Sequence, residues 1–332
     1  NTCSGAAGSG HVHILQWARL ENCPWDSATC SKAAGAGHLG VLQWARAHGC
    51  SWSPMTCAGA AAGGHLEVLR WSRANGANWA MRTTYRAAEG GHLELLQWVT
   101  AQGYTLDWMV AQGCRLPEHA GSMAASSGHV HILEWLQACH HAWSQVSIAP
   151  AAAAGGHVRV LRWARANGIP WGEEECQAAA SRGHLGALRW ARCNGCPWDE
   201  DTCSGAAGTG HLDILQWARA QHCPWDIRTC SQAAGRGHFD VLKWARCNGC
   251  PWDEGTFSGA AGVGHLDILE WTRAQGCPWD SLTCGAAAGR GHFQVLKWAR
   301  CNGCPWDEET CTRAAQAGRL EILQWARAGG CP

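Results

Sequence analysis

The sequence has no excess of charge of either sign. Lysine and arginine together number 26, as do aspartate and glutamate, so the formal net charge at pH 7 is zero. Proteins that bind nucleic acid or an anionic membrane usually carry a basic surface, which supplies most of the affinity. The composition therefore predicts that neither nucleic acid nor a membrane is the partner.

Long apolar runs and targeting signals are also absent. No stretch approaches the roughly 18 apolar residues that a membrane-spanning helix needs, and no secretory signal opens the chain. The sequence starts Asn1-Thr2-Cys3 without an initiator methionine and stops at Cys331-Pro332, and both ends fall inside a repeated motif. We therefore expect no membrane insertion and a chain that forms part of a longer polypeptide.

Sequence motifs of catalysis are missing as well. There is no Gly-x-Gly-x-x-Gly after a strand, no Walker loop and no nucleophile elbow. We predict that the protein is not an enzyme and uses no cofactor.

What the sequence does contain is a unit of about 27 residues that recurs along almost the whole chain, a period typical of repeat proteins. Each copy has a glycine, then a histidine (arginine in the last copy), then a tryptophan, and half of the copies also have Cys-Pro-Trp. The residues after this glycine are His11, His38, His65, His92, His129, His157, His184, His211, His238, His265, His292 and Arg319. Such a period predicts one supersecondary unit stacked many times. We expect an all-α, right-handed solenoid of about 12 helix-turn-helix repeats, forming a single array over residues 1–332.

One copy, residues 26–52, shows the expected elements. Asp26 or Thr29 can cap a short first helix, helix A, and Gly37 ends it in the left-handed conformation. A second helix, helix B, runs from His38, has a broad apolar face and ends at Gly49. Helices this short are marginal in isolation, so each copy depends on its neighbours for stability.

Residues 99–150 are the least regular part of the array. The interval from His92 to His129 is the longest of all, and that from His129 to His157 also exceeds the usual period. We expect a longer helix B or a bulging loop near residues 104–118, and an interruption of helix A by Pro150.

The pattern within the unit resembles the ankyrin repeat. Ala33-Ala34, the run Gly37-His38-Leu39-Gly40-Val41-Leu42 and the later Gly49 match its Ala-Ala-x-x-Gly-His-Leu-x-Val-Val core, and the match spans all twelve copies. The unit is shorter than the ankyrin repeat of about 33 residues, and the loss falls between Gly49 and Thr56. The resemblance implies a tryptophan- and cysteine-rich variant that lacks much of the β-hairpin.

The resemblance also implies a function in protein–protein interaction without chemistry of its own. In ankyrin-like stacks helix A lines the concave side, where the variable residues of this sequence are mostly small and neutral. We expect a non-catalytic scaffold that binds a protein partner along this face. A structural subunit of a larger assembly is one form that such a scaffold can take. The candidate partner-binding residues are Ser31, Lys32, Tyr85, Arg86, Ser204, Ser231, Gln232 and Ser258.

Three other repeated features have structural interpretations that we favour over functional ones. The histidines would cap helix B and bond the adjacent turn, rather than form a metal-binding ladder. The tryptophans would fill the core between repeats, rather than stack bases, sugars or pigments. Arginines after Trp-Ala, such as Arg46, would neutralise nearby aspartates such as Asp26 and fix the register between copies.

An alternative function is based on the 21 cysteines. Six Cys-x6-Cys pairs join a return loop to the next helix A: Cys23/Cys30, Cys50/Cys57, Cys196/Cys203, Cys223/Cys230, Cys277/Cys284 and Cys304/Cys311. Disulfides are geometrically conceivable there, but we favour buried thiols, which suit a reducing intracellular compartment, the cytoplasm or an organelle interior. The alternative is a metal-binding or redox-responsive solenoid. Its candidate ligands are Cys193, Cys196 and Cys203, and the histidines His129, His131, His140 and His141.

Overall fold

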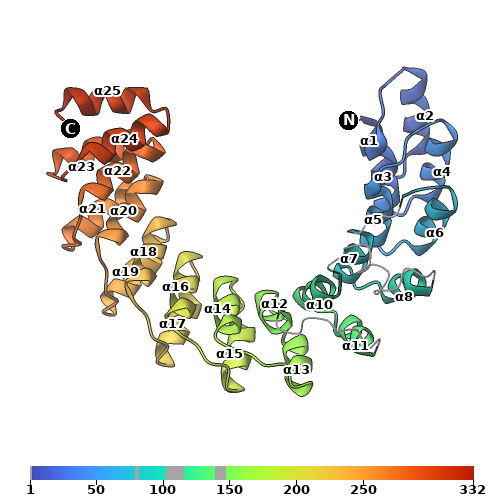
Figure 1. Ribbon diagram of the computed structural model, residues 1–332, viewed down its shortest axis with the longest axis horizontal. Coiled ribbons are helices and arrows are strands. Elements are labelled where there is room, and N and C mark those ends of the chain that lie inside the picture. The colour runs from blue at the N-terminus through green and yellow to red at the C-terminus, as the bar shows by residue number, and fades with distance from the viewer. Residues whose placement is uncertain (1, 79–81, 102–115, 139–146) are drawn as a thin grey trace. The chain divides into compact units, whose positions relative to one another are not determined.

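The predicted all-α repeat fold is confirmed by a computed structural model that describes residues 2–78, 82–101, 116–138 and 147–332. Across these ranges it contains 24 helices and no strand. The helices form twelve successive pairs, each with an A helix followed by a B helix (Figure 1). The return loops between pairs contain no strand in these ranges, so the hairpin of the ankyrin repeat is missing where the sequence predicted its loss.

The helix pairs fall into two compact units, residues 1–170 and 171–332. In the first unit the A helices are α1 (Thr2–Gly8), α3 (Ser27–Gly35), α5 (Pro54–Ala62), α7 (Arg82–Glu89), α10 (Leu116–Ser126) and α12 (Ile148–Ala154). The B helices are α2 (Val12–Leu20), α4 (Leu39–Ala47), α6 (Leu66–Ala74), α8 (Leu93–Ala101), α11 (Val130–Ala138) and α13 (Val158–Ala166).

The second unit has the same alternation. Its A helices are α14 (Glu174–Ser181), α16 (Glu200–Gly208), α18 (Ile227–Gly235), α20 (Glu254–Val263), α22 (Ser281–Arg290) and α24 (Glu308–Gln316). Its B helices are α15 (Leu185–Cys193), α17 (Leu212–Ala220), α19 (Phe239–Cys247), α21 (Leu266–Ala274), α23 (Phe293–Cys301) and α25 (Leu320–Ala328). A single array over residues 1–332 stays a prediction.

Local sequence signals begin and end the helices as expected. Asp26 is the N-cap of α3 and accepts a hydrogen bond from the Ala28 amide at 3.0 Å. The same bond recurs at Asp199, Asp226, Asp280 and Asp307. Gly37, just beyond α3, adopts φ +79°, and Gly49 adopts φ +83° after α4. Both glycines therefore occupy the left-handed region that other residues avoid.

The histidines differ from their predicted role as side-chain caps. His38 stands at the N-cap position of α4, but its side chain makes no capping hydrogen bond. The ring instead lies against Gly10 of the preceding repeat, where an added Cβ would meet it at 2.8 Å. In two later repeats, Nε2 of His92 is hydrogen-bonded to the Ala62 carbonyl at 3.1 Å, and Nε2 of His129 to the Glu89 carbonyl at 3.0 Å. The second half of the prediction, a bond to the adjacent turn, is therefore confirmed for these two histidines.

Close packing of the A helices depends on glycine and alanine. An added Cβ on Gly59 of α5 would lie 3.1 Å from the Ser31 carbonyl oxygen and 3.3 Å from the Gly35 Cα of α3. Gly259 and Gly235 make the equivalent approach between α20 and α18. Within each unit, successive A helices pack against each other, whereas successive B helices make few contacts. Because the A helices are closer together than the B helices, each unit bends toward the A helices. The A helices therefore line its concave side.

The tryptophans in the described ranges lie at the margin of the core rather than in it. The fully buried residues are mainly alanine, leucine, valine, isoleucine and cysteine. Trp52 of a return loop packs against Trp71 of the following B helix, with ring centroids 6.0 Å apart, and both rings are half-buried. The prediction that tryptophan fills the core is therefore wrong for these residues. A flat indole spans two repeats at the outer edge, while small side chains allow the helices to approach inside.

The irregular region is described only in part. Residues 102–115 and 139–146, which include most of the expected bulge, lie outside the described residues. Pro150 does not interrupt its helix as predicted, because α12 begins at Ile148 and the proline occupies the first turn. An amide in that turn has no partner within the helix, so proline is tolerated there.

Candidate functional site: hollows on the A-helix surface

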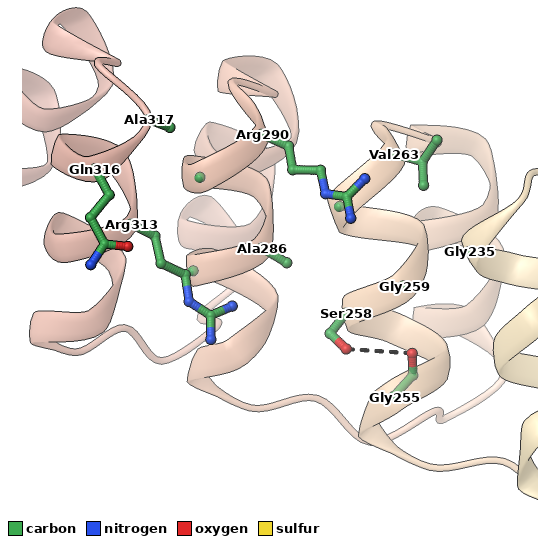
Figure 2. A pocket seen from close by; sticks show the side chains of 13 residues that line it. Gly235, Gly255, Ser258, Gly259, Val263, Ala286, Arg290, Arg313, Gln316 and Ala317 are labelled. Carbon is green, nitrogen blue, oxygen red and sulfur yellow. Dashed lines mark hydrogen bonds between the residues drawn. The ribbon is translucent and has the colours of Figure 1, made fainter. Parts of the chain in front are cut away.

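The surface of the A helices in the second unit is hollowed between α18 and α24 (Figure 2). This hollow encloses about 600 Å³. Its floor consists of small residues, among them Gly235, Gly259, Gly262, Gly285 and Ala286. The absence of side chains allows a bound chain to approach the helix backbones closely.

Two arginines extend across this floor. Figure 2 shows Arg290 and Arg313 reaching from their own helices toward the preceding A helix. The Arg290 Nε would lie 3.9 Å from a Cβ added to Gly262, and Arg313 packs over Gly285 and Gly289 in the same way. Arg313 also pairs with Glu309 at 2.9 Å. The two arginine side chains therefore lie close to glycines and present hydrogen-bond donors to the hollow.

A second hollow of the same unit lies over α14, α16 and α18. It is lined by Asp201, Gln232, Arg228 and Arg236, with small residues between them. Arg228 contacts the carboxylates of Asp201 and Asp226, the latter at 2.7 Å. This hollow therefore carries charges of both signs, partly paired with each other.

The first unit has a related hollow near its first two A helices. Ser4, Gly5, Gly8, Ser31 and Lys32 line it. Lys32 is exposed and is the only charged residue of the lining. Small neutral residues beside at least one cationic side chain are thus common to the three hollows.

The eight predicted partner-binding residues all lie on A helices. Five of them line these hollows: Ser31, Lys32, Ser204, Gln232 and Ser258. The other three are Tyr85 and Arg86 of α7 and Ser231 of α18, and Arg86 pairs with Glu89 at 2.9 Å. Each of the four serines donates its hydroxyl hydrogen to a carbonyl of its own helix. Their hydroxyl groups can therefore offer a partner mainly acceptor lone pairs.

The arginines of the hollows were missed by the sequence analysis. The same position in alternate repeats holds Arg182, Arg236 and Arg290. Arg236 and Arg290 line two of the hollows, whereas Arg182 lines none of the three. Each arginine is exposed at the C-terminal end of an A helix, namely α14, α18 or α22. Their recurrence in every second copy was a signal in the sequence that could have identified them.

The candidate metal ligands are placed apart from one another. Cys193 is exposed at the end of α15, whereas Cys196 and Cys203 are buried in contact with other cysteines. His129 and His131 are neighbours, with rings 5.6 Å apart, but their Nε2 atoms are bonded to the Glu89 and Gly91 carbonyls. His140 and His141 lie outside the described residues. Within the part of the chain that the structure describes, no three potential ligands converge.

The cysteine thiols contact each other in a register that the sequence did not suggest. All described cysteines are free thiols. Cys30 of α3 is hydrogen-bonded to Cys50, at the far end of the same repeat, rather than to Cys23. The Cys50 thiol also donates to the Asp26 carbonyl at 3.3 Å. The predicted buried thiols are therefore present, but their neighbours are different.

The repeated arginines contact the return loops and not the aspartates that the sequence suggested. Arg192 lies 4.5 Å from the Trp198 ring centroid and donates to the Cys196 carbonyl at 3.0 Å. Asp199, next along the chain, caps α16. The predicted arginine–aspartate neutralisation is replaced by two separate local contacts, because the aspartate is already engaged by helix amides.

The chain is similar in structure to other helical-repeat proteins. The ankyrin repeat domain of human ASB11 aligns with 47% of this chain and 84% of its own, at 15% identity and a TM-score of 0.39. The pentatricopeptide repeat protein PPR10, in complex with an 18-nt psaJ RNA element, aligns with 99% of this chain at 16% identity and a TM-score of 0.39. The chain spans 58% of that protein's length. Maize PPR10 aligns at a TM-score of 0.37. Neither a family model nor a curated protein sequence matches the chain.

The RNA-bound neighbour corrects the prediction that nucleic acid is excluded. A helical-repeat protein that aligns with nearly the whole chain is in complex with RNA. Net charge alone cannot exclude nucleic acid, because the total says nothing about how the charges are distributed. Arg236 lines one hollow and Arg290 another. None of the described helices is long and apolar enough to cross a bilayer.

Proposed function

We propose that this protein is a non-catalytic scaffold that binds an elongated protein segment along the A helices. The observation that carries the proposal is the hollow over α18–α24, whose small floor residues continue across successive repeats. A binding surface spread over repeats suits a solenoid, in which each unit contacts only its neighbours.

The hollow favours a partner that lies close to the helix backbones. Glycine and alanine of the floor offer contact area without side chains that must be ordered on binding. Arg290 and Arg313 can donate to carbonyl or carboxylate groups of the partner, since a guanidinium offers several donors in a planar arrangement. The small side chains thus allow the partner to approach closely, and the arginines fix its orientation.

A pair of matched variants tests the proposal. Ala286→Lys places a long side chain in the hollow, whereas Gln294→Lys adds the same group to the exposed surface of α23 in the same repeat. Wild type and both variants would be used for affinity capture from the source cell, with cross-linking mass spectrometry to locate the contact. We expect a stoichiometric protein, cross-linked to α18–α24, that is retained by Gln294→Lys and lost with Ala286→Lys.

A nuclease-treated sample separates the two classes of partner. A protein recovered only before nuclease treatment would be held through nucleic acid, and the proposal would fail. It would also fail if both lysine variants retained the partner equally, because the binding surface would then lie elsewhere.

A further inference from the structure

Six pairs of cysteines bring the two ends of a repeat together through contacting thiols. In each pair the first cysteine lies near the start of an A helix, and the second lies in the return loop after the B helix of the same repeat. The pairs are Cys30–Cys50, Cys176–Cys196, Cys203–Cys223, Cys230–Cys250, Cys284–Cys304 and Cys311–Cys331. The contact therefore recurs at the same repeat positions in both units.

Each pair is held in place by the backbone and shielded from water. Cys284 and Cys304 are both 0% exposed. The Cys304 thiol donates to the Asp280 carbonyl at 3.4 Å, and Asp280 is the N-cap of the helix that carries Cys284. The two thiols therefore converge on the first turn of one helix.

We propose that these pairs are sites of reversible disulfide formation, in which a low-molecular-weight disulfide such as glutathione disulfide clips the start of each A helix to the return loop of its own repeat. We call this pairing the within-repeat register. It differs from the sequence-based Cys-x6-Cys pairing, the between-repeat register, in which the return-loop cysteine would bond the A-helix cysteine of the next repeat. The inference does not depend on the binding function proposed above.

The reaction is a thiol–disulfide exchange in two steps. The thiolate of one cysteine attacks a sulfur of glutathione disulfide, the glutathione S–S bond breaks, and one glutathione thiolate leaves. The second cysteine then attacks the protein sulfur of this mixed disulfide and releases the second glutathione. The two protons of the protein thiols end on the two glutathione molecules, and two electrons pass from the protein to glutathione.

The thiol contact itself distinguishes the two cysteines in three pairs. The hydrogen bond from its partner lowers the pKa of Cys50, and likewise that of Cys250 and Cys304. The same contact, with burial, raises the pKa of Cys30, Cys230 and Cys284. The order is not the same in every pair, because the contact with Cys203 and burial raise the pKa of return-loop Cys223. Since the thiolate is the reactive form, either cysteine of a pair can make the first attack.

Two cysteines serve as internal controls. Cys277 is buried in a return loop, and its thiol donates to the Asp253 carbonyl at 3.6 Å. The A-helix position of its own repeat holds Phe257 instead of cysteine. Cys57 of α5 has Ala77 at the corresponding loop position. The within-repeat register gives neither thiol a cysteine to bond, whereas the between-repeat register would bridge Cys277 to Cys284 and Cys57 to Cys50.

The test is a disulfide map of the full chain. The reduced protein would be incubated with glutathione disulfide just below the onset of melting, quenched in acid, alkylated and digested without reductant. Glutathionylation of the exposed cysteines shows that the reagent is active; these are Cys193, Cys247 and Cys301. We expect bridges between Cys284 and Cys304 and between Cys30 and Cys50, with Cys277 and Cys57 in no intramolecular bridge. The melting temperature should rise by several degrees, and a reductant should reverse the rise.

Two results would overturn the proposal. One is a map dominated by Cys277–Cys284 and Cys50–Cys57 bridges. The other is the absence of intramolecular bridges once the exposed cysteines are fully modified. The variant Cys304→Ser should leave Cys284 without an intramolecular bridge while Cys230–Cys250 still forms. A Cys284–Cys277 bridge in this variant would also contradict the assigned register.

Discussion

The guanidinium of Arg246 lies over the ring of Trp252, 4.3 Å from its centroid, and donates to the Cys250 carbonyl at 3.2 Å. Trp252 in turn packs edge-on against Trp271 of the next B helix, with centroids 5.9 Å apart. A single arginine thus fixes a return loop whose tryptophan contacts the following repeat. This arrangement explains why arginine, tryptophan and the Cys-Pro-Trp loop recur together.

The first prediction concerns this contact. Arg246→Ala should lower the free energy of unfolding by about 1–2 kcal/mol, because it removes a cation–π contact and a hydrogen bond. Arg246→Lys should recover only part of the loss, since an ammonium group lacks the planar stacking surface. Urea denaturation followed by circular dichroism measures both. Arg182→Ala, at an exposed position after α14, is the control. Equal effects at positions 182 and 246 would count against this role.

The second prediction compares two helical glycines. Gly59→Ala should destabilise the first unit by about 1–3 kcal/mol, because its methyl group would press on the Ser31 carbonyl and the Gly35 Cα across the helix contact. Gly40→Ala in α4 should instead stabilise by about 0.4–1 kcal/mol, since nothing lies within 4 Å of its added Cβ and alanine restricts the unfolded chain. Thermal melts of the two variants should move in opposite directions. A shift of the same sign in both would argue that the A-helix contact tolerates expansion.

The sequence was sufficient to predict the features that depend on neighbouring residues. The Asp26 cap, the left-handed Gly37 and the span of α4 all follow from local backbone requirements. Their predictions needed no knowledge of how the repeats stack.

Contacts between distant parts of the chain were not predictable in this way. Cys50 and Cys57 are close in sequence, yet the loop folds back so that Cys50 meets Cys30. Likewise, Arg46 and Asp26 looked complementary as charges, but Asp26 is engaged by the Ala28 amide and Arg46 by Trp52. The course of the backbone through the return loop and the helix start decided these contacts, and sequence spacing and composition do not reveal that course.

Among the residues that line the hollows, Lys32, Gln232 and three serines were predicted from the sequence, whereas the arginines were not. Ser258 and Gln232 were identified because the repeats vary at those positions. Arg236 and Arg290 occur in alternate repeats only, so reading one copy at a time did not reveal that they lie along the same surface.

The third prediction concerns pH. Burial lowers the pKa of His129 below its ordinary 6.5, nearby His131, His157 and His92 add to the shift, and its bond to the Glu89 carbonyl opposes it. The unfolded chain therefore binds a proton at a pH where folded His129 is still neutral. The contribution of neutral His129 to the free energy of unfolding is therefore fully present above about pH 6.5, the pKa in the unfolded chain. This contribution is lost as the pH falls through the lower pKa of the folded state. Melting temperatures measured from neutral pH downward should fall less steeply in His129→Gln than in wild type. An unchanged slope would show that His129 does not contribute.

The fourth prediction creates a further cysteine pair. Phe257 is buried between the rings of Trp279 and Trp298, at centroid distances of 5.1 and 6.3 Å, and occupies the position that holds cysteine in neighbouring repeats. Phe257→Cys should cost about 2–4 kcal/mol in the reduced protein, because it removes a buried ring and leaves a cavity. Its thiol should then contact Cys277, the one return-loop cysteine of the second unit that lacks this neighbour. Under glutathione disulfide the variant should form a bridge to Cys277 and regain part of the lost stability. Phe257→Ala, with a similar cavity and no thiol, should lose stability in both redox states and leave Cys277 unbridged. A variant that melts at the same temperature with and without oxidant would show that the two positions are too far apart to close.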